Sequence, residues 1–152
     1  MTSSPGSNAN RPGNDVALFA MRLMLGAVFV FHGSQKLFGW FDGHGLTGMG
    51  EFLKSLNVPV PGVSAVLAAC AEFFGGVALI FGLAVRLATL PMIFTMLVAV
   101  FVAHKDAFDA QKGGMEYALT LAVMLFALTI MGPGRLTLPR LIRQKPSADR
   151  AP

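Results

Sequence analysis

Ionisable side chains are few in this chain, and one of them lies inside a long apolar segment. Glu72 falls near the middle of residues 64–83, which are otherwise apolar or weakly polar. An ionised group at the bilayer centre costs about 2.5–3.5 kcal/mol, so such an acid is expected to be paired, protonated or turned toward a polar interior. Small side chains let a neighbouring backbone approach closely, so the face of Glu72 predicts a packing seam. The residues that share this face are Ala65, Ala68, Gly75 or Gly76, and Leu79.

Other groups capable of chemistry stand at the ends of further apolar segments. The candidates for a shared polar pocket are His32, Lys36, Glu72, His104, Glu116 and Tyr117. Such a set could bind a polar head group, relay protons, or hold a metal through two imidazoles and a carboxylate. No short motif such as HExxH joins any two of them, so their meeting depends on helix packing, and no metal site is predicted. The alternative assigns His32 and His104 to hydrogen bonds with loop backbone, and Glu116 to the N-terminus of its own helix.

Arg22 is the one basic side chain well inside an apolar segment. Two alternatives are open for it. It pairs with Glu72, or it extends toward head groups at the membrane surface. Helical side chains lean toward the N-terminus of their helix, which favours the second alternative if the two helices are antiparallel. Arg86, in a short loop, joins Arg22 and Glu72 as a candidate for structural ion pairs.

Composition sets the fold class. The chain of 152 residues is 54% hydrophobic and 13% charged, with a mean hydropathy of +0.62, which is too apolar for an ordinary soluble domain. Apolar segments at 16–31, 64–83, 87–103 and 117–131 predict an all-α integral membrane four-helix bundle. Apolar residues at helical spacing over 46–57 predict a short amphipathic helix in the first external loop. The expected domains are a flexible cytoplasmic tail over 1–14, a membrane domain over 15–134 and a basic cytoplasmic tail over 135–152.

The basic residues follow the pattern of a multi-pass membrane protein. With four spans, eight Lys and Arg residues fall on the side of the two termini and four on the other side. This asymmetry predicts that the N- and C-termini are cytoplasmic. The net charge of +4 is thereby explained without a nucleic-acid partner. Cys70 is the only cysteine, so no disulfide forms within the chain.

A family resemblance rests on four stretches that occur in order over residues 16–138: HGSQKLFGWFDGHGLTG, AEFFGGVALIFGLAVRLA, AHKDAFDAQKGGMEYAL and MGPGRL. Together they resemble the DoxX family of small bacterial membrane proteins. The resemblance implies a four-helix protein of the bacterial inner membrane. It also implies an association with membrane redox chemistry, because relatives include the small membrane subunit of a thiosulfate:quinone oxidoreductase and a member found with thiol-oxidation and superoxide-removing enzymes.

The polar residues that recur in the family correspond here to His32, Lys36, Glu72, Arg86, His104 and Glu116. The family often continues its Gly-Pro-Gly with Ser-Leu-Asp, whereas this chain has Thr137, Leu138 and Pro139 at those positions. Any role that the family's aspartate has in this ending is therefore not assigned to this chain.

Three functions remain open at this point. The first is a membrane subunit or scaffold for redox or oxidative-stress partners, which binds a quinone or lipid head group in an outer-half polar pocket. The second is the quinone-reducing membrane subunit of an oxidoreductase, in which Glu72 and His32 pass protons. The third is a small transporter, for which four short spans leave room only if the protein forms a homo-oligomer. Whether the chain is an enzyme is left open, since no nucleophile has a recognisable setting.

Overall fold

The computed structural model describes residues 12–143, which are helical with connecting loops and contain no strand. The apolar segments found in the sequence become the long helices. In chain order the elements are α1 (Pro12–Phe38), α2 (Gly45–Ser55), α3 (Pro61–Phe81), α4 (Val85–Val98), the π-helical turn η2 (Ala99–Ala103), the 3₁₀ turn η3 (Ala110–Lys112), α5 (Glu116–Met131) and α6 (Leu138–Arg143). The predicted amphipathic helix between the first two apolar segments is present as α2.

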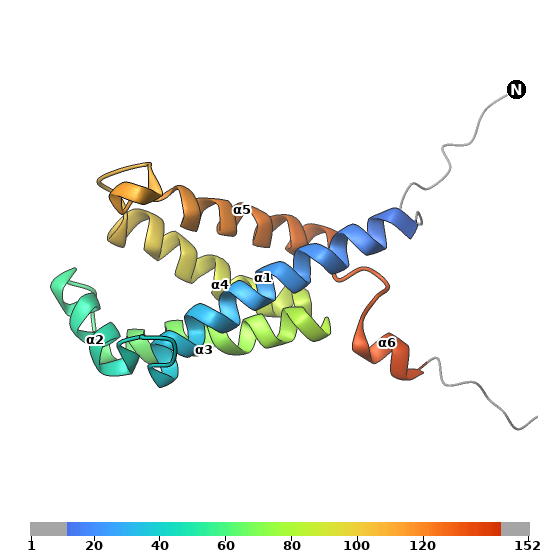
Figure 1. Cartoon of the computed structure of the whole chain (residues 1–152), viewed down its shortest axis with the longest axis horizontal. Helices are drawn as coiled ribbons and strands as arrows, with labels where there is room; N and C mark the ends of the chain where they lie inside the picture. Colours follow the sequence, from blue (N-terminus) through green and yellow to red (C-terminus); the bar gives the residue numbers. More distant parts are fainter. Residues whose placement is uncertain (1–11, 144–152) are drawn as a thin grey trace, which may run out of the picture.

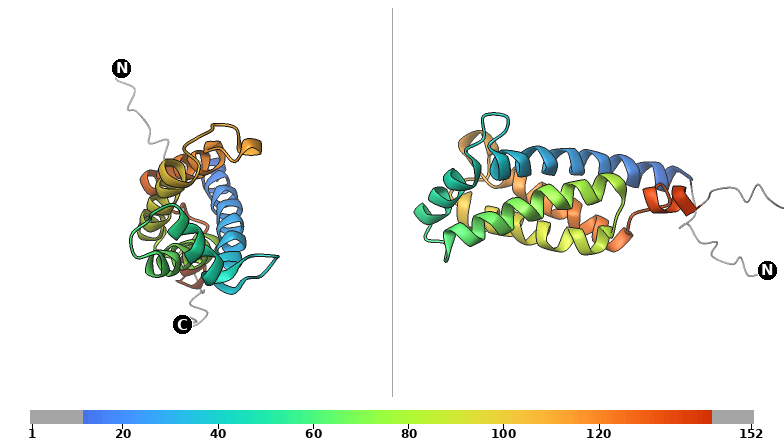
Figure 2. Two further views of the ribbon diagram at one scale, coloured as in Figure 1. Left: turned by 90° about the vertical axis from the view of Figure 1, so that its left-hand side faces the viewer. Right: turned by 90° about the horizontal axis from the view of Figure 1, so that it is seen from below.

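The long helices pack in a bundle whose two ends differ. α1 packs against α3, α3 against α4 and α4 against α5, while α1 and α5 share few contacts. One end, called here the α2 end, carries α2 and the loop between η2 and α5 (Figure 1). The opposite end, called the α6 end, carries α6 and the start of α1, so the described chain begins and ends on the same side (Figure 2).

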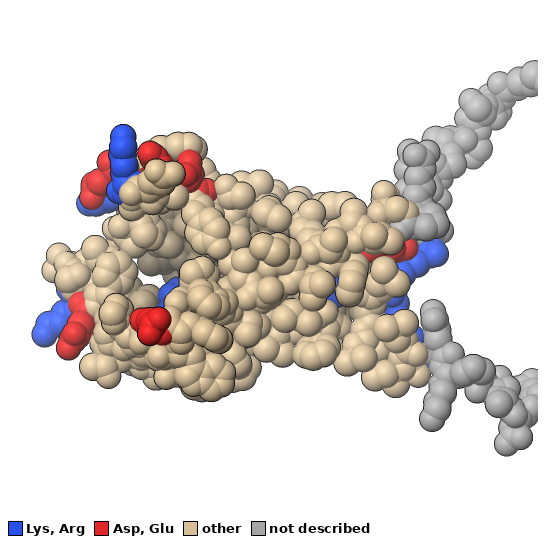
Figure 3. Space-filling view, viewed as in Figure 1, with Lys and Arg blue, Asp and Glu red and all other residues tan. Residues whose placement is uncertain are grey.

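The outside of the bundle is apolar between these ends. α1, α3 and the continuous α4–η2 helix are each long and apolar enough to cross a membrane, whereas α5 has 16 residues. Large apolar side chains point outward, among them Leu87, Phe94 and Phe101, which are 68–70% exposed. In the space-filling view, charged side chains gather at the two ends and the surface between them is uncharged (Figure 3). An outside of this kind is suited to lipid rather than water, which confirms the expected all-α membrane class.

Glycine lets α1 and α3 touch through their backbones. A Cβ atom added at Gly33 would lie 2.5 Å from the backbone nitrogen of Phe73, and one at Gly76 would lie 2.8 Å from the carbonyl oxygen of Gly26. The buried residues of α3 are Ala65, Ala69, Glu72, Gly75, Gly76 and Leu79. The predicted seam is therefore present, with Ala69 fully buried where the sequence favoured Ala68, which is partly exposed.

Gly33→Ala is expected to destabilise the protein by about 1–3 kcal/mol, because the new methyl group would overlap the backbone of α3. Gly50→Ala in α2 is the matched control, since a Cβ there meets nothing within 4 Å. Alanine also favours helix over glycine by up to about 1 kcal/mol, so the control is expected to be neutral or stabilising. Thermal unfolding in detergent measures both. Equal melting temperatures for Gly33→Ala and wild type would exclude the close backbone contact.

The described parts of the two expected tails are ordered. α1 already begins at Pro12, which suits the first turn of a helix. Beyond residue 134 the chain packs back onto the bundle, where Thr137 is only 5% exposed, and then forms α6. The remaining tail residues, 1–11 and 144–152, lie outside the described residues.

Candidate functional site

The acid in the middle of α3 is neutralised by a lysine on α1. The Nζ atom of Lys36 lies 2.5 Å and 2.6 Å from the two carboxylate oxygens of Glu72. Glu72 is 2% exposed and Lys36 is 28% exposed, so the pair reaches the surface only on the lysine side. The contact of Gly33 with Phe73 brings the two residues together, because Lys36 follows Gly33 by about one turn and leans back toward it.

Arg22 lies at the opposite end of the bundle from this pair. Its side chain is 0% exposed, and it donates from Nη1 to the carbonyl oxygen of Leu79 (3.2 Å) and from Nη2 to that of Leu136. Phe19 covers the guanidinium, with 5.7 Å between the Cζ atom and the ring centroid. Arg22 therefore neither pairs with Glu72 nor extends into head groups, which corrects both alternatives drawn from the sequence. Its acceptors are a carbonyl at the end of α3, which also accepts the backbone N–H of Gly82, and a carbonyl of the loop after α5.

Arg86 also binds a main-chain carbonyl. Its Nη2 atom donates to Ile130 at the end of α5 over 3.2 Å. Within residues 12–143 the structure gives Arg86 no carboxylate partner. Arg22 and Arg86, both candidates for structural ion pairs, are thus found in hydrogen bonds to backbone, and Glu72 pairs with Lys36.

His32 belongs to a short polar chain on the α1 side of the α2 end. Its Nδ1 atom donates to Oε1 of Gln35 over 3.1 Å, and its ring lies 6.1 Å from the ring of Tyr117. Gln35 in turn donates from Nε2 to the carbonyl oxygen of Phe41 over 3.1 Å. His32 is thereby linked through Gln35 to the loop that follows α1.

His104 and Glu116 hold the loop between η2 and α5. The Nδ1 atom of His104 donates to the carbonyl oxygen of Gly113 over 2.8 Å, and Oε1 of Glu116 accepts from the backbone N–H of Ala110 over 2.9 Å. For His104 this is the backbone hydrogen bond that the alternative interpretation predicted. Glu116 bonds to the loop rather than only facing its own helix N-terminus.

A cavity of about 300 Å³, lined by both polar and apolar residues, opens beside Lys36 at the α2 end. It lies between the end of α1, the following loop and α2. That loop folds tightly onto α1, because a Cβ atom at Gly43 would come within 2.4 Å of the carbonyl oxygen of Gln35. The residues that line the cavity are Gln35, Lys36, Asp42, Gly43, His44, Gly45, Gly48, Met49 and Phe52.

Only part of the predicted pocket set meets at this cavity. Lys36 lines it, Glu72 stands behind Lys36, and His32 reaches it through Gln35. Tyr117 touches His32, whereas His104 and Glu116 serve the neighbouring loop. Sequence reasoning did not single out Gln35, Asp42 or His44 as lining residues. Gln35 had one signal, its place between His32 and Lys36 in the stretch HGSQK. Within residues 12–143, no group of three or more His, Cys, Asp or Glu side chains is arranged to hold a metal ion.

These features of residues 12–143 define a helical membrane protein with a buried ion pair that borders a cavity at the end of the bundle. The model of the DoxX family matches residues 17–105, which is more than half of the chain. The chain therefore belongs to the DoxX family, and the resemblance seen in the sequence is confirmed.

Curated relatives cover most of the chain. It is 26% identical to the inner membrane protein YqjF of Escherichia coli (strain K12), over 86% of this chain and 95% of the relative. It is 28% identical to the inner membrane protein YphA of the same organism, over 82% of this chain and 89% of that relative. It is 27% identical to a Bacillus subtilis (strain 168) protein named "Putative oxidoreductase CatD", over 76% of this chain and 80% of that relative. No solved structure matches the chain significantly.

Proposed function

We propose that this protein is an inner-membrane subunit that supports redox partners and holds the head group of a quinone in the cavity at the α2 end. The geometry of Lys36 supports this most directly. An ammonium group has three N–H donors, and two of them point to the carboxylate oxygens of Glu72. The third has no partner within the described residues, and the side chain lines the cavity.

A quinone carbonyl oxygen is a suitable acceptor for that third donor. Glu72 fixes the ammonium group of Lys36 in place, and a hydrogen bond from an ammonium group to a neutral carbonyl is charge-assisted. Met49 and Phe52 of α2 add apolar walls against which a flat ring can pack. Gln35 adds a second polar group at the same cavity, connected to His32.

The role as a redox subunit is supported by the redox association that the family resemblance implies and by the name of the Bacillus subtilis relative, "Putative oxidoreductase CatD". In this proposal the electrons come from a partner protein, and this chain supplies the membrane-embedded binding site. A role in assembly is supported by the small size of the described bundle and by the two loops at the α2 end, which present polar surface to a partner (Figure 3).

The proposal includes a topology with four spans. α5 runs antiparallel to α4 and is apolar along its length, so it serves as the fourth span with its 16 residues. The excess of Lys and Arg, eight against four, then places the α6 end and both termini in the cytoplasm. The cavity beside Lys36 consequently opens toward the outer side of the inner membrane. Cysteine-accessibility labelling at Ser55 and Arg140 in intact cells and inverted vesicles tests this orientation.

Quinone binding is expected to quench the fluorescence of Trp40, the only tryptophan, which lies two residues from the cavity residue Asp42. A short-chain ubiquinone is titrated into the detergent-solubilised protein. The double variant Lys36→Met/Glu72→Leu removes the donor without leaving a buried charge unpaired. It is expected to bind the quinone about tenfold more weakly, because one charge-assisted hydrogen bond is lost.

Lys54→Met is the matched control, because Lys54 is exposed on α2 and does not line the cavity. It is expected to bind as wild type does. Equal quenching by the quinone in wild type and in the double variant would remove Lys36 from the site. Partner association is tested separately, by purification from native membranes at native expression, where recovery of the protein without any redox protein would count against the assembly role.

A further inference from the structure

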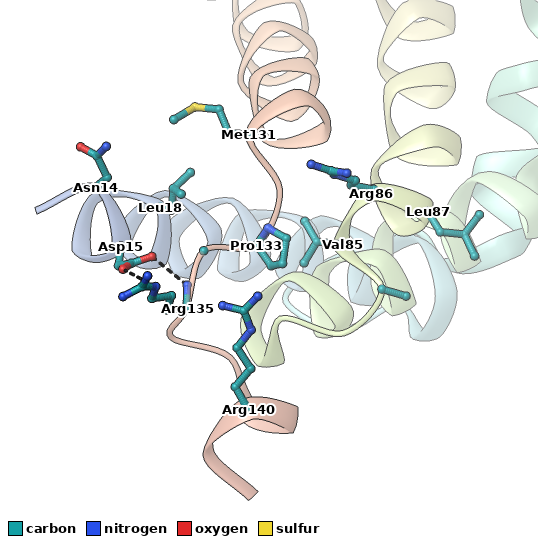
Figure 4. A pocket seen from close by; sticks show the side chains of 12 residues that line it. Asn14, Asp15, Leu18, Val85, Arg86, Leu87, Met131, Pro133, Arg135 and Arg140 are labelled. Atoms are coloured by element: carbon teal, nitrogen blue, oxygen red, sulfur yellow. Dashed lines mark hydrogen bonds and ion pairs between the residues drawn. The ribbon is translucent and has the colours of Figure 1, made fainter. Parts of the chain in front are cut away.

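A second and larger cavity lies at the α6 end, far along the bundle from the Lys36 site. It measures about 980 Å³ and is lined by residues of α1, the start of α4, the end of α5, the Gly-Pro-Gly linker and α6. Figure 4 shows Arg86 and Arg140 extending toward the linker from two different helices, on either side of Pro133 and Val85.

The charge of this cavity is unbalanced. Its lining contains three arginines, at positions 86, 135 and 140, and one acid, Asp15, for a formal net charge of 3 − 1 = +2. Asp15 is engaged by Arg135, since its Oδ1 atom accepts the Arg135 backbone N–H over 2.8 Å and its Oδ2 atom lies 3.9 Å from Arg135 Nε. Arg86 and Arg140 have no carboxylate partner within residues 12–143.

Most donors of these two arginines are still open. A guanidinium carries five N–H donors, and Arg86 uses one of them on the carbonyl oxygen of Ile130. The side chain of Arg140 makes no hydrogen bond within the described residues. α4 also begins at this cavity, with no side chain capping its first turn, which adds partial positive charge.

The arginines are held there by the fold. Gly132 and Gly134 both have positive φ (79° and 72°), so the linker turns sharply after α5 and crosses the start of α1 at Asp15 and Leu18. The buried Arg22 then fixes that crossing by its bond to the carbonyl oxygen of Leu136. The linker is therefore a built part of the cavity wall, and it carries α6 with Arg140 to the side opposite Arg86.

The walls are apolar on the membrane side. Leu18, Val85 and Met131 line the cavity, and Leu87 at its edge is 70% exposed on the lipid-facing surface of α4. A ligand that matches both features has a negatively charged phosphate at one end and an apolar chain beside it.

We infer that the cavity at the α6 end binds the phosphate of an anionic phospholipid, with Arg86 and Arg140 as its two ligands and the acyl chains alongside Leu87. Guanidinium groups bind phosphate oxygens through paired, charge-assisted hydrogen bonds, which a zwitterionic head group satisfies less well because its own cation competes. This site is independent of the quinone cavity, since no residue lines both.

The test uses the full-length protein in dodecyl maltoside, titrated with dioleoyl phosphatidylglycerol, dioleoyl phosphatidylcholine or sn-glycerol 3-phosphate. Native mass spectrometry counts bound lipid, and thermal unfolding reports stabilisation. Phosphatidylglycerol is expected to bind and raise the melting temperature more than phosphatidylcholine does. Arg140→Gln is expected to weaken its binding about tenfold, as loss of a charge-assisted contact implies. Arg86→Gln is expected to act in the same direction.

Arg140→Gln is the decisive variant, because the side chain holds no other group in the described structure and the fold should not depend on it. Lys105→Gln, an exposed residue of the loop at the α2 end, makes the same change of charge and should leave binding unchanged. Wild-type affinity for phosphatidylglycerol in Arg140→Gln would overturn the site. Equal stabilisation by sn-glycerol 3-phosphate at the same concentration would overturn the lipid as the source of the phosphate.

Discussion

Lys36→Met is expected to lower the free energy of unfolding by about 3 kcal/mol, because it leaves the carboxylate of Glu72 buried without its counter-ion. Glu72→Gln is expected to cost less. The lysine that it leaves behind is 28% exposed and can turn its charge toward water, whereas Glu72 is 2% exposed and cannot. Lys36→Met is therefore expected to lose more stability than Glu72→Gln, because Lys36 is the partner that reaches the surface.

The double variant Lys36→Met/Glu72→Leu should recover most of the loss, since a buried pair replaced by apolar groups of similar volume is near neutral. Titration of SDS into detergent micelles, followed by circular dichroism, measures wild type, Lys36→Met, Glu72→Leu and the double variant, which are the four species of this cycle. Lys54→Met controls for loss of a lysine at the same end and should change stability by less than about 0.5 kcal/mol. Additive losses in the double variant would mean that Lys36 and Glu72 do not interact.

Arg22→Leu is expected to destabilise the protein by roughly 3 kcal/mol and to loosen the α6 end. Two bonds from a charged donor are lost, and the carbonyl oxygens of Leu79 and Leu136 lose a buried partner. Because the second bond holds the linker between α5 and α6, trypsin should cleave after Arg135 and Arg140 faster than in wild type.

Arg22→Lys is the graded control for this prediction. A lysine can reach one of the two carbonyls but lacks the planar fork that serves both, so an intermediate loss is expected. Arg143→Leu removes an exposed arginine of α6 and should leave the stability unchanged. If Arg22→Leu retained wild-type stability and wild-type trypsin resistance, Arg22 would not be the residue that anchors the linker.

The burial of Glu72 could be predicted because helical spacing alone fixes which residues share its face. Ala65, Gly76 and Leu79 lie on that face in the structure as the period of 3.6 requires. The partner of Glu72 could not be predicted, because it depends on the register between α1 and α3. That register is set by the backbone contacts at Gly26 and Gly33, which no pattern within a single helix reveals.

Arg22 shows a second limit of sequence reasoning. Its depth in the apolar segment left two alternatives, a pair with Glu72 or an extension toward head groups, and the structure shows neither. The structure provides carbonyl oxygens instead, at the end of α3 and in the linker after α5. Carbonyl oxygens that can accept a further donor arise where helices end and loops cross them, so the sequence alone does not show them.

The cavity beside Lys36 was only partly predictable for a related reason. His32 and Lys36 share a face of α1 at a spacing of four, which placed them together. The other wall comes from the loop after α1, where Phe41 and Asp42 adopt positive φ and turn the chain back over Gln35. The glycines of this stretch predicted a turn, but positive φ is uncommon for a bulky residue such as Phe41, so the path of the turn could not be predicted.

The unequal helix lengths have a consequence for the surrounding lipid. α5, with 16 residues, measures about 24 Å, whereas α1, with 27 residues, measures about 40 Å. A hydrocarbon core is about 30 Å thick, so in the proposed four-span topology the bilayer thins beside α5 while α1 tilts or projects beyond it. The hydrophobic mismatch is therefore expected to differ between the two sides of the protein. Shorter-chain lipids should gather beside α5, and the protein should favour membranes that compress easily.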